Sequence, residues 1–354
     1  MKKILVIQQK MIGDVLTSSV LFEELRHAHP NAQLDYLINS HTFPVVENNP
    51  FIDDFIFFTK DAEQSKKELF KLAKQVRKRN YDVVIDVYSK LSSNLISLLS
   101  GAKTKISYYK PYTSFVYNKN IKRKTQTDSK AGLAIVNRFQ LLEPLNIFKT
   151  SAKPKIYLSE KEIDGGKQFL TKNNIDLSKP LFMISVLGSD MTKTYPFGYM
   201  ANVIDTIAEV TKGQILFNYI PNQKDDAQTI FNMCKKSTQN HILFDVFGRS
   251  LREFLTITHY CTALIGNEGG AVNMAKALDI PTFTIFSPWI DTKTWSVFED
   301  TNNVSVHLNN YKPNLFKNKT AKELKKEISI LYQEFKPNYF TDQLAGFLKK
   351  NNSI

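Results

Sequence analysis

The stretch that decides the fold is residues 263–281, with the sequence ALIGNEGGAVNMAKALDIP. It begins as an apolar strand, passes through a carboxylate and two glycines, and continues with the spacing of a helix before a second strand. Glycines let the backbone approach a ligand closely, and the free N–H groups and positive dipole end of the helix favour an anion. The stretch therefore predicts a binding corner for a nucleotide or sugar phosphate, with an ordinary strand-to-helix turn as the alternative.

Short apolar runs alternate with helix-length segments on both sides of this corner. In the C-terminal half the predicted strands are residues 181–187, 215–219, 242–244, 262–265 and 282–286. In the N-terminal half they are residues 4–7, 34–38, 55–58 and 83–87. This alternation is typical of parallel sheets with helical crossovers. The sequence therefore predicts an α/β protein with two doubly wound, Rossmann-like domains facing across a cleft, where the carboxyl ends of the two sheets bind ligands.

The boundary between the two domains is predicted near the polar, proline-containing segment 149–154. The N-terminal domain then covers residues 1–165 and the C-terminal domain residues 175–335. Near the C-terminus, apolar spacing from Leu324 to Phe335 marks an amphipathic helix. A last helix is predicted at about 338–354, with the N-terminal domain as one place for it to pack.

The composition is that of a folded protein in a reducing compartment. Hydrophobic residues make up 42% of the 354 residues, and the longest apolar runs fall far short of the roughly 20 residues that a membrane-spanning helix needs. The first residues, MKKILVI, lead directly into Gln8 and Gln9, as a strand does and a secretory signal does not. Cys234 and Cys261 lack metal-ligand spacing, so reduced thiols and a cytoplasmic location are expected.

The net charge of +13 is concentrated in residues 101–130, which hold eight Lys or Arg residues and one acid. Aromatic residues interleave with these charges at Tyr108, Tyr109, Tyr112, Phe115 and Tyr117. Such a stretch is suited to a phosphorylated glycolipid or an anionic membrane surface, and a solvated surface without a partner is the alternative. No nucleic-acid-binding motif accompanies it, so nucleic acid ranks lowest. The residues assigned to an acceptor or membrane surface are Lys119, Lys122, Arg123 and Lys124.

Two further loops carry side chains that could take part in chemistry. Residues 8–16, QQKMIGDVL, follow the first strand and place Asp14 at the ligand-binding end of the sheet, where a helix cap is the alternative role. Residues 187–196, LGSDMTKTYP, follow another strand, and Lys193 in this loop could reach a diphosphate as a mobile point charge.

Together the three loops resemble the heptosyltransferases of glycosyltransferase family 9, which transfer heptose from a nucleotide-activated donor in lipopolysaccharide core synthesis. The family's N-terminal strand, Met-Gly-Asp-Val-Leu type loop and helix are similar to residues 4–25, and its Lys-x-Trp-Pro element is similar to residues 193–196. Its Asp-Ser/Thr-Gly-x-x-His segment, small-residue helix and Pro-Thr strand resemble residues 268–286. A weaker match to a Gly-x-x-Ser-Leu segment lies at residues 247–253. The resemblance spans residues 1 to about 300.

Three positions depart from the family pattern. Tyr195 stands for Trp, Glu268 for Asp, and Asn273 for His. Glu268 keeps the charge on a longer arm, whereas Asn273 removes a titratable group. The changes at Glu268 and Asn273 bear most directly on the identity of the donor.

The resemblance implies a GT-B fold with an N-terminal acceptor domain, a C-terminal donor domain, and inversion at the anomeric carbon without an essential metal or cofactor. In that scheme Asp14 is the general base and Lys193 neutralises the departing nucleotide diphosphate. ADP-heptose is the favoured donor, and a lipopolysaccharide core or lipid A-type glycolipid is the acceptor, reached from the cytoplasmic face of the inner membrane. The predicted donor-binding residues are Gly13, Ser189, Thr192, Lys193, Glu268, Gly269, Gly270, Ala271 and Asn273.

Two other functions compete with this one. A nucleotide-dependent enzyme of another class, such as a dehydrogenase, would share the α/β domains, but no Gly-x-Gly-x-x-Gly follows either leading strand. A non-catalytic glycan- or nucleotide-binding protein with a transferase fold is suggested by Glu268 and Asn273, while Asp14 and Lys193 argue against it.

Overall fold

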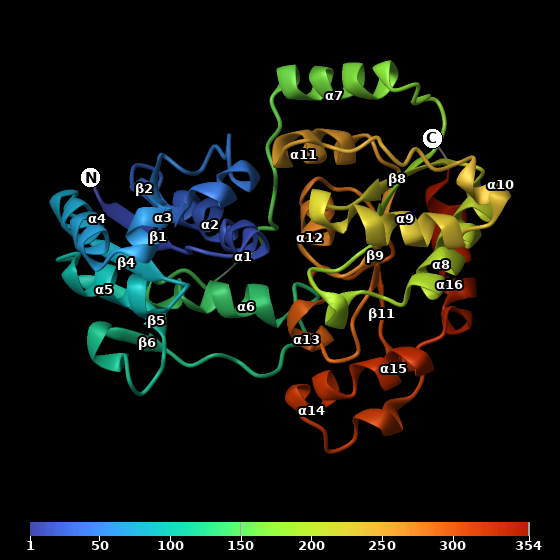
Figure 1. Cartoon of the computed structure of the whole chain (residues 1–354). Coiled ribbons are helices and arrows are strands. Elements are labelled where there is room, and N and C mark those ends of the chain that lie inside the picture. The colour runs from blue at the N-terminus through green and yellow to red at the C-terminus, as the bar shows by residue number, and fades with distance from the viewer. Residues whose placement is uncertain (149, 353–354) are drawn as a thin grey trace. The chain divides into compact units, whose positions relative to one another are not determined.

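The computed structural model describes residues 1–148 and 150–352, which form two compact units, Met1–Tyr157 and Leu158–Ile354. Each unit is a parallel sheet with helices on both faces (Figure 1). Lys149 of the predicted boundary segment and residues 353–354 of the predicted last helix lie outside the described residues. The two doubly wound α/β domains expected from the sequence are confirmed.

Unit 1 has a six-stranded sheet in the order β3-β2-β1-β4-β5-β6. Its strands are β1 (Lys3–Ile7), β2 (Gln33–Asn39), β3 (Asp54–Phe58), β4 (Val83–Asp86), β5 (Thr104–Tyr108) and β6 (Lys119–Ile121). Its helices are α1 (Ile12–Ser18), α2 (Val20–Ala28), α3 (Lys60–Gln64), α4 (Lys66–Lys78), α5 (Leu91–Leu99) and α6 (Leu133–Gln140). This is the strand order of the Rossmann fold. The order reverses between β1 and β4, and proteins with this fold bind their ligands at the reversal point.

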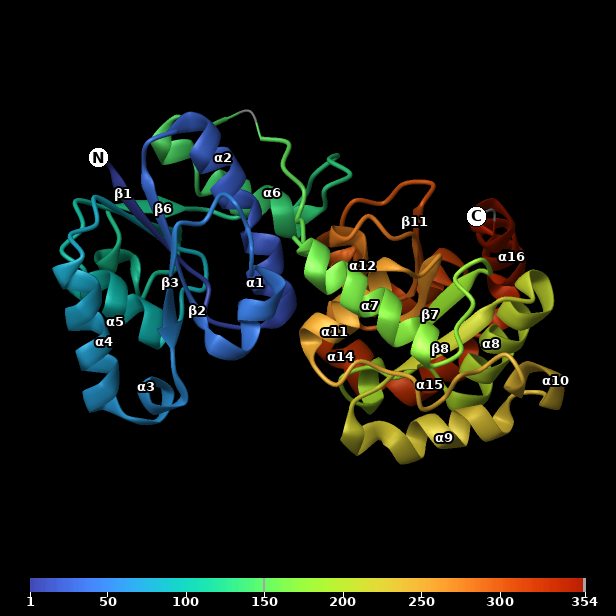
Figure 2. The ribbon, with the colours of Figure 1, turned by 90° about the horizontal axis from the view of Figure 1, so that it is seen from above.

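The helices of unit 1 divide between the two faces of the sheet, as Figure 2 shows from above. Leu5 and Ile7 of β1 pack in one core with Ala62 of α3, Val76 of α4 and Ile96 of α5. Because side chains alternate along a strand, Ile4 and Val6 serve the opposite face, and all four are fully buried. A central strand buried on both faces is apolar throughout, as the sequence of β1 is.

Unit 2 has a five-stranded sheet in the order β11-β10-β9-β7-β8. Its strands are β7 (Leu181–Ser185), β8 (Gln214–Asn218), β9 (Ala263–Asn267), β10 (Thr282–Ile285) and β11 (Asn303–Val306). Its helices are α7 (Glu160–Lys172), α8 (Phe197–Thr211), α9 (Lys224–Met233), α10 (Lys236–Gln239), α11 (Leu251–His259), α12 (Gly270–Ala277), α13 (Thr292–Trp295), α14 (Ala321–Lys326), α15 (Ile328–Glu334) and α16 (Thr341–Asn351). The order reverses between β7 and β9, as in flavodoxin-like sheets.

The structure corrects the predicted placement of two helices, α7 and α16, in the domains. Helix α7, partly assigned to a first domain of residues 1–165, belongs to unit 2 and packs against α11 (Figure 1). The last helix, for which packing on the N-terminal domain was considered, lies against α8 of unit 2 (Figure 2). Its apolar residues Leu344, Phe347 and Leu348 are buried in the core of that unit.

Several predicted elements differ in detail. The first helix is interrupted at Ser19, so α1 and α2 replace one continuous helix, and the C-terminal amphipathic segment forms α14 and α15. Residues 242–244 form only an isolated bridge, at Ile242 to Ile215. Within the described residues, no helix is both long and apolar enough to span a membrane.

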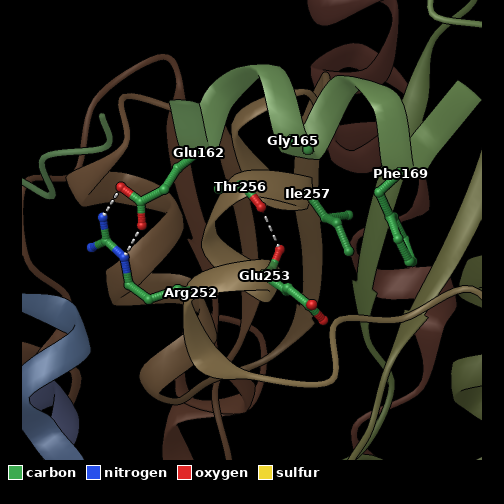
Figure 3. Close-up of a pocket in the computed structure, with 8 residues that line it drawn as sticks. Glu162, Gly165, Phe169, Arg252, Glu253, Thr256 and Ile257 are labelled. Carbon is green, nitrogen blue, oxygen red and sulfur yellow. Dashed lines mark hydrogen bonds and ion pairs between the residues drawn. The ribbon is translucent and has the colours of Figure 1, made fainter. Parts of the chain in front are cut away.

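An ion pair between Glu162 of α7 and Arg252 of α11 forms a clamp that joins the two helices. Glu162 accepts hydrogen bonds from Arg252 Nε at 2.6 Å and Nη2 at 2.7 Å, and both residues line a cavity of about 240 Å³ between the helices (Figure 3). Gly166 of α7 lies close to α11, because a Cβ built on it would lie 3.0 Å from Thr256 Cβ. The hydrogen bonds from Arg252 and, to a smaller extent, from Ser159 lower the pKa of Glu162 to about 2.

We predict that Glu162→Gln destabilises unit 2 by about 1–2 kcal/mol at pH 7, where the partly buried ion pair is intact. Because folding lowers the Glu162 pKa from 4.5 to about 2, the contribution is full above pH 4.5 and is lost as the pH falls toward 2. Glutamine can still complete the capping box with Ser159, so the helix end is preserved.

The measurement is urea unfolding of both proteins at pH 7, 4 and 3, with Glu160→Gln, an exposed position in the same turn, as the control. The free-energy difference for Glu162→Gln should shrink at pH 3, and a difference that stays constant with pH would contradict the role of the clamp.

Candidate active site

The candidate site of unit 2 lies where the strand order reverses, between β7 and β9. Ser185 at the end of β7 pairs with Gly266 of β9. Gly266 has φ +128°, and a Cβ at this residue would lie 2.4 Å from the Ser185 carbonyl oxygen. Only glycine permits this approach. The loop after β7 and the loop after β9 consequently leave the sheet side by side.

Asn267, which the sequence analysis did not single out, ties these two loops together. Its Oδ1 accepts a hydrogen bond from the Tyr195 backbone N–H at 2.7 Å, and its Nδ2 donates to the Ser185 carbonyl at 2.9 Å. Tyr195 is fully buried among aromatic side chains and donates its hydroxyl proton to the Phe335 carbonyl. The tyrosine therefore has a core role at the position where the family has tryptophan.

Lys193 and Glu268, predicted from separate loops, meet at this point. Lys193 Nζ lies 3.4 Å from Glu268 Oε1, and the Glu268 side chain is only 10% exposed. Glu268 Oε1 has no hydrogen-bond partner among the described residues, since the lysine contact is an ion pair without hydrogen-bond geometry. Burial raises the pKa of Glu268 and the charge of Lys193 opposes this. A buried carboxylate with spare acceptor capacity is suited to a ligand hydroxyl.

The loop that carries Lys193 is held firmly by its neighbours. Asp190 Oδ1 accepts from the Thr192 N–H at 2.8 Å and from its hydroxyl at 2.6 Å. The Thr192 carbonyl accepts from Ser287 Oγ at 2.7 Å and from Trp289 Nε1 at 3.1 Å. Of the predicted donor-binding residues here, Ser189 is exposed, whereas the Thr192 hydroxyl is already engaged as a donor.

Two residues beside this loop, Trp289 and Lys325, were not predicted from the sequence. Lys193 Nζ lies 5.6 Å from the centroid of the Trp289 ring, and Lys325 Nζ lies 4.6 Å from it. Lys325 also contributes to lowering the pKa of Asp190, after the hydrogen bond from Thr192. The two cations thus come from the loop after β7 and from α14, which lie far apart in the sequence.

The helix after Glu268 has an open N-terminus. Helix α12 begins at Gly270 after Gly269, and a Cβ built on Gly269 would meet nothing within 4 Å. The first amides of a helix, here those of Gly270 and Ala271, have no intrahelical acceptor. Asn273 is half-buried in the first turns, and no hydrogen bond of its side chain is found among the described residues. The corner therefore has free backbone donors beside open space, and anion binding there stays a prediction.

Asp14 in unit 1 is bound by a buried arginine. Its Oδ1 accepts from Arg138 Nη2 at 2.7 Å, and Arg138 also donates to Ser18 Oγ and to the Ala134 carbonyl, both at 2.8 Å. The alternative role of Asp14 as helix cap is wrong, because the N-cap of α1 is Met11. Gly13 precedes Asp14 within the same helix. Arg138, on α6, was not predicted, since nothing in a sequence marks which arginine will be buried.

The basic stretch of unit 1 forms β5, β6 and the loops around them. Lys119, Lys122, Arg123 and Lys124 are all exposed. Tyr109, Tyr112 and Phe115 are exposed as well. The interleaved aromatics do not form one surface, however, because Tyr108 and Tyr117 are buried and the Tyr117 hydroxyl donates to Asp86 Oδ2 at 2.6 Å.

Metal ligands do not gather anywhere in the described part of the chain, where no group of three or more His, Cys, Asp or Glu residues could hold an ion. Cys234 and Cys261 are free and buried. Burial raises the pKa of the Cys234 thiol to about 12, so it is not a reactive nucleophile.

Comparison with known proteins agrees with this arrangement. The family model of glycosyltransferase family 9 (heptosyltransferase) matches residues 69–325. A putative glycosyltransferase of Haemophilus influenzae is 23% identical over 81% of this chain and 82% of its own length. Lipopolysaccharide heptosyltransferase 1 of Campylobacter coli is 23% identical over 80% of this chain and 83% of its own.

Solved structures share the fold. A family 9 glycosyltransferase of Veillonella parvula superposes with a TM-score of 0.76 at 18% identity and covers 94% of this chain and 98% of its own. An Escherichia coli heptosyltransferase solved with ADP-2-deoxy-2-fluoro heptose has a TM-score of 0.67 at 16% identity, covering 93% and 99%. These likenesses confirm the GT-B fold, and the family match removes the dehydrogenase and the non-catalytic binding protein as leading alternatives. The chain belongs to glycosyltransferase family 9, the heptosyltransferase family, and is a glycosyltransferase.

Proposed function

We propose that the protein transfers heptose from ADP-heptose to a lipopolysaccharide core or lipid A-type acceptor, with inversion at the anomeric carbon. The observation that carries this proposal is the meeting of Lys193, Glu268 and the open N-terminus of α12 at the strand reversal of unit 2. The named activity of the Campylobacter coli relative and the ADP-sugar in the Escherichia coli structure support heptose and adenine.

Unit 2 is the donor domain in this proposal. Lys193 and the amides of Gly269, Gly270 and Ala271 bind the diphosphate, and Glu268 binds hydroxyls of the sugar. Ser189, Thr192, Asn273 and, from unit 1, Gly13 complete the predicted donor contacts. These groups supply the positive charge that the leaving diphosphate needs, so neither a metal nor a cofactor is required.

Unit 1 is the acceptor domain, with Asp14 as general base. Asp14 Oδ1 is held by Arg138, while Oδ2 accepts no hydrogen bond among the described residues. As the acceptor oxygen attacks the anomeric carbon, its proton passes to Asp14. The bond from the anomeric carbon to the phosphate oxygen breaks at the same time, and its electron pair leaves with the nucleoside diphosphate.

In this proposal the exposed cations of the basic stretch bind the surface of the membrane in which the acceptor lies. Lys119, Lys122, Arg123 and Lys124 would contact anionic headgroups at the cytoplasmic face of the inner membrane, with the exposed aromatics Tyr109, Tyr112 and Phe115 beside them. The association is peripheral in this proposal.

We predict that Lys193→Ala weakens ADP binding about 10- to 100-fold, the range for losing a hydrogen bond to a charged group. The measurement is calorimetric titration with ADP, and Lys167→Ala, which removes an exposed charge on α7, is the control. Equal affinity in wild type and Lys193→Ala would rule out this placement of the diphosphate.

Asp14→Asn should slow sugar transfer by roughly 10²- to 10⁴-fold, because the base is lost. Asparagine keeps the size of the side chain and an oxygen that can accept from Arg138, so the fold should be preserved. ADP affinity and the thermal unfolding midpoint, measured on the same variant, should match the wild type. If Asp14→Asn transfers sugar at the wild-type rate, Asp14 is not the general base.

Reversing Lys119, Lys122, Arg123 and Lys124 to Glu should abolish binding to liposomes that contain anionic lipid, with the largest difference at low salt. Sedimentation with such liposomes at two salt concentrations measures this. The control reverses exposed lysines of α4, namely Lys66, Lys67, Lys74 and Lys78. If both variants bind as the wild type does, the stretch is not a membrane surface.

A further inference from the structure

The last turn of α14 lies beside the loop that carries Lys193. Lys325 Nζ, in that turn, lies 4.6 Å from the centroid of the Trp289 ring, and Lys193 Nζ lies 5.6 Å from the same centroid. An ammonium group is attracted to the negative face of an aromatic ring, and tryptophan attracts it most strongly. One indole ring therefore gathers two cations from parts of the chain that are far apart in the sequence.

The Trp289 ring is fixed in place by the Lys193 loop. Its Nε1 donates a hydrogen bond to the Thr192 carbonyl at 3.1 Å, and the Tyr332 hydroxyl of α15 donates to the same carbonyl at 3.4 Å. The ring also packs against the hydrophobic core of unit 2. Because Thr192 directly precedes Lys193, the ring keeps a set position relative to that lysine.

Helix α14 is anchored in the same unit. Leu324 is buried in the core, and a capping box between Thr320 and Glu323 fixes the start of the helix. Lys325 directly follows the buried leucine and is itself exposed. The lysine side chain thus begins at a fixed point, while its ammonium group is open to a ligand.

The two cations differ in the acids that hold them. Lys193 Nζ lies 3.4 Å from Glu268 Oε1, whereas Lys325 forms no ion pair with an acid in the described part of the chain. The hydrogen bond from Thr192 is the main cause that lowers the pKa of Asp190, and the charge of Lys325 is a smaller one. Lys325 can therefore turn to a bound anion without breaking an ion pair.

Lys193 connects this pair of cations to the proposed phosphate corner. Its ammonium group lies near the Trp289 ring and also near Glu268, the residue directly before the two glycines that open α12. The stem of a lysine is long and flexible. A phosphate bound by Lys193 is consequently within reach of Lys325.

We propose that Lys325 is a second phosphate-binding residue of the donor site, and that Trp289 is the positioning residue that holds it beside Lys193. The inference rests on the proposed function, because it takes the ligand to be a nucleoside diphosphate sugar. When the bond between the anomeric carbon and the phosphate oxygen breaks, its electron pair leaves one additional negative charge on the terminal phosphate. A second cation therefore stabilises the leaving group more than the intact donor, and such a difference accelerates transfer.

The test is calorimetric titration of the full-length protein with ADP. Lys325→Met removes the charge and keeps much of the apolar stem, so ADP should bind about 10-fold more weakly, as expected when one hydrogen bond to a charged group is lost. Lys326→Met is the matched control, because Lys326 is an exposed neighbour in the same turn and its loss changes the net charge equally. Unchanged ADP affinity in Lys325→Met, or equal losses in the two variants, would overturn the proposal.

Adenosine separates phosphate binding from a structural role of Lys325, since it has the same base and ribose without phosphate. Lys325→Met should bind adenosine as the wild type does, which protein NMR chemical shifts measure. Lys325→Arg keeps the charge and can stack on Trp289, so its ADP affinity should be close to that of the wild type. Equal weakening of ADP and adenosine in Lys325→Met, or the same loss of ADP affinity in Lys325→Arg, would contradict the assigned role.

The role of Trp289 is tested by a double-mutant cycle. Trp289→Leu removes the aromatic face and should weaken ADP binding at least as much as Lys325→Met does. If Trp289 acts by holding Lys325, adding Lys325→Met to Trp289→Leu should have little further effect on ADP affinity. Losses that multiply in the double variant would exclude Trp289 as the positioning residue.

Failure of this inference is distinguishable from failure of the proposed function. A wild-type protein that does not bind ADP would count against the proposed function. A wild-type protein that binds ADP, with a loss of affinity in Lys193→Ala and none in Lys325→Met, would refute only the role of Lys325.

Discussion

The close approach of β7 and β9 at Ser185 and Gly266 is the constraint on which the donor site depends. Without a Cβ at Gly266 the two strands can pair at the reversal point, and Asn267 then fastens the Tyr195 backbone and the Ser185 carbonyl to the same place. Lys193 meets Glu268 because both loops leave the sheet there. A larger residue at position 266 would push β7 and β9 apart. Lys193 and Glu268 would then be separated, although the new side chain itself contacts no ligand.

Each unit places one carboxylate against one cation near the reversal point of its sheet. Glu268 is paired with Lys193, a flexible and partly exposed ammonium, whereas Asp14 is paired with Arg138, a buried guanidinium that makes two further hydrogen bonds. The difference suits the proposed roles. A lysine can move from the carboxylate to a diphosphate, while an arginine bound at three points keeps a base in one orientation.

Much of this fold could be predicted because buried parallel strands are apolar along their whole length. The strands near residues 4–7, 181–185 and 263–265 stood out for that reason. Strands β5, β6 and β11 were missed, since β6 is a three-residue edge strand beginning with Lys119 and β11 contains Asn303 and Ser305. Short polar edge strands are stabilised by their neighbours rather than by their own pattern.

The candidate site could be predicted only where a residue follows its own strand. Asp14, Lys193 and Glu268 do so, and the loops after parallel strands must meet at one edge. Arg138 on α6 and Lys325 on α14 reach the sites from helices elsewhere in the chain, and local sequence holds no signal for such contacts. Trp289 lies in the loop after β10, so its position was open to the same reasoning and was overlooked. The alternative role of Asp14 as a helix cap is wrong because the helix begins earlier, at Ile12.

Hydrogen exchange with and without ADP tests the central claim most directly. The amides of Gly270 and Ala271 lack intrahelical acceptors, so they should exchange fast in the free protein and slowly when a diphosphate binds them. The account predicts protection of residues 269–272 and 188–194 on addition of ADP. Protection elsewhere in the chain, with these two loops unchanged, would contradict it.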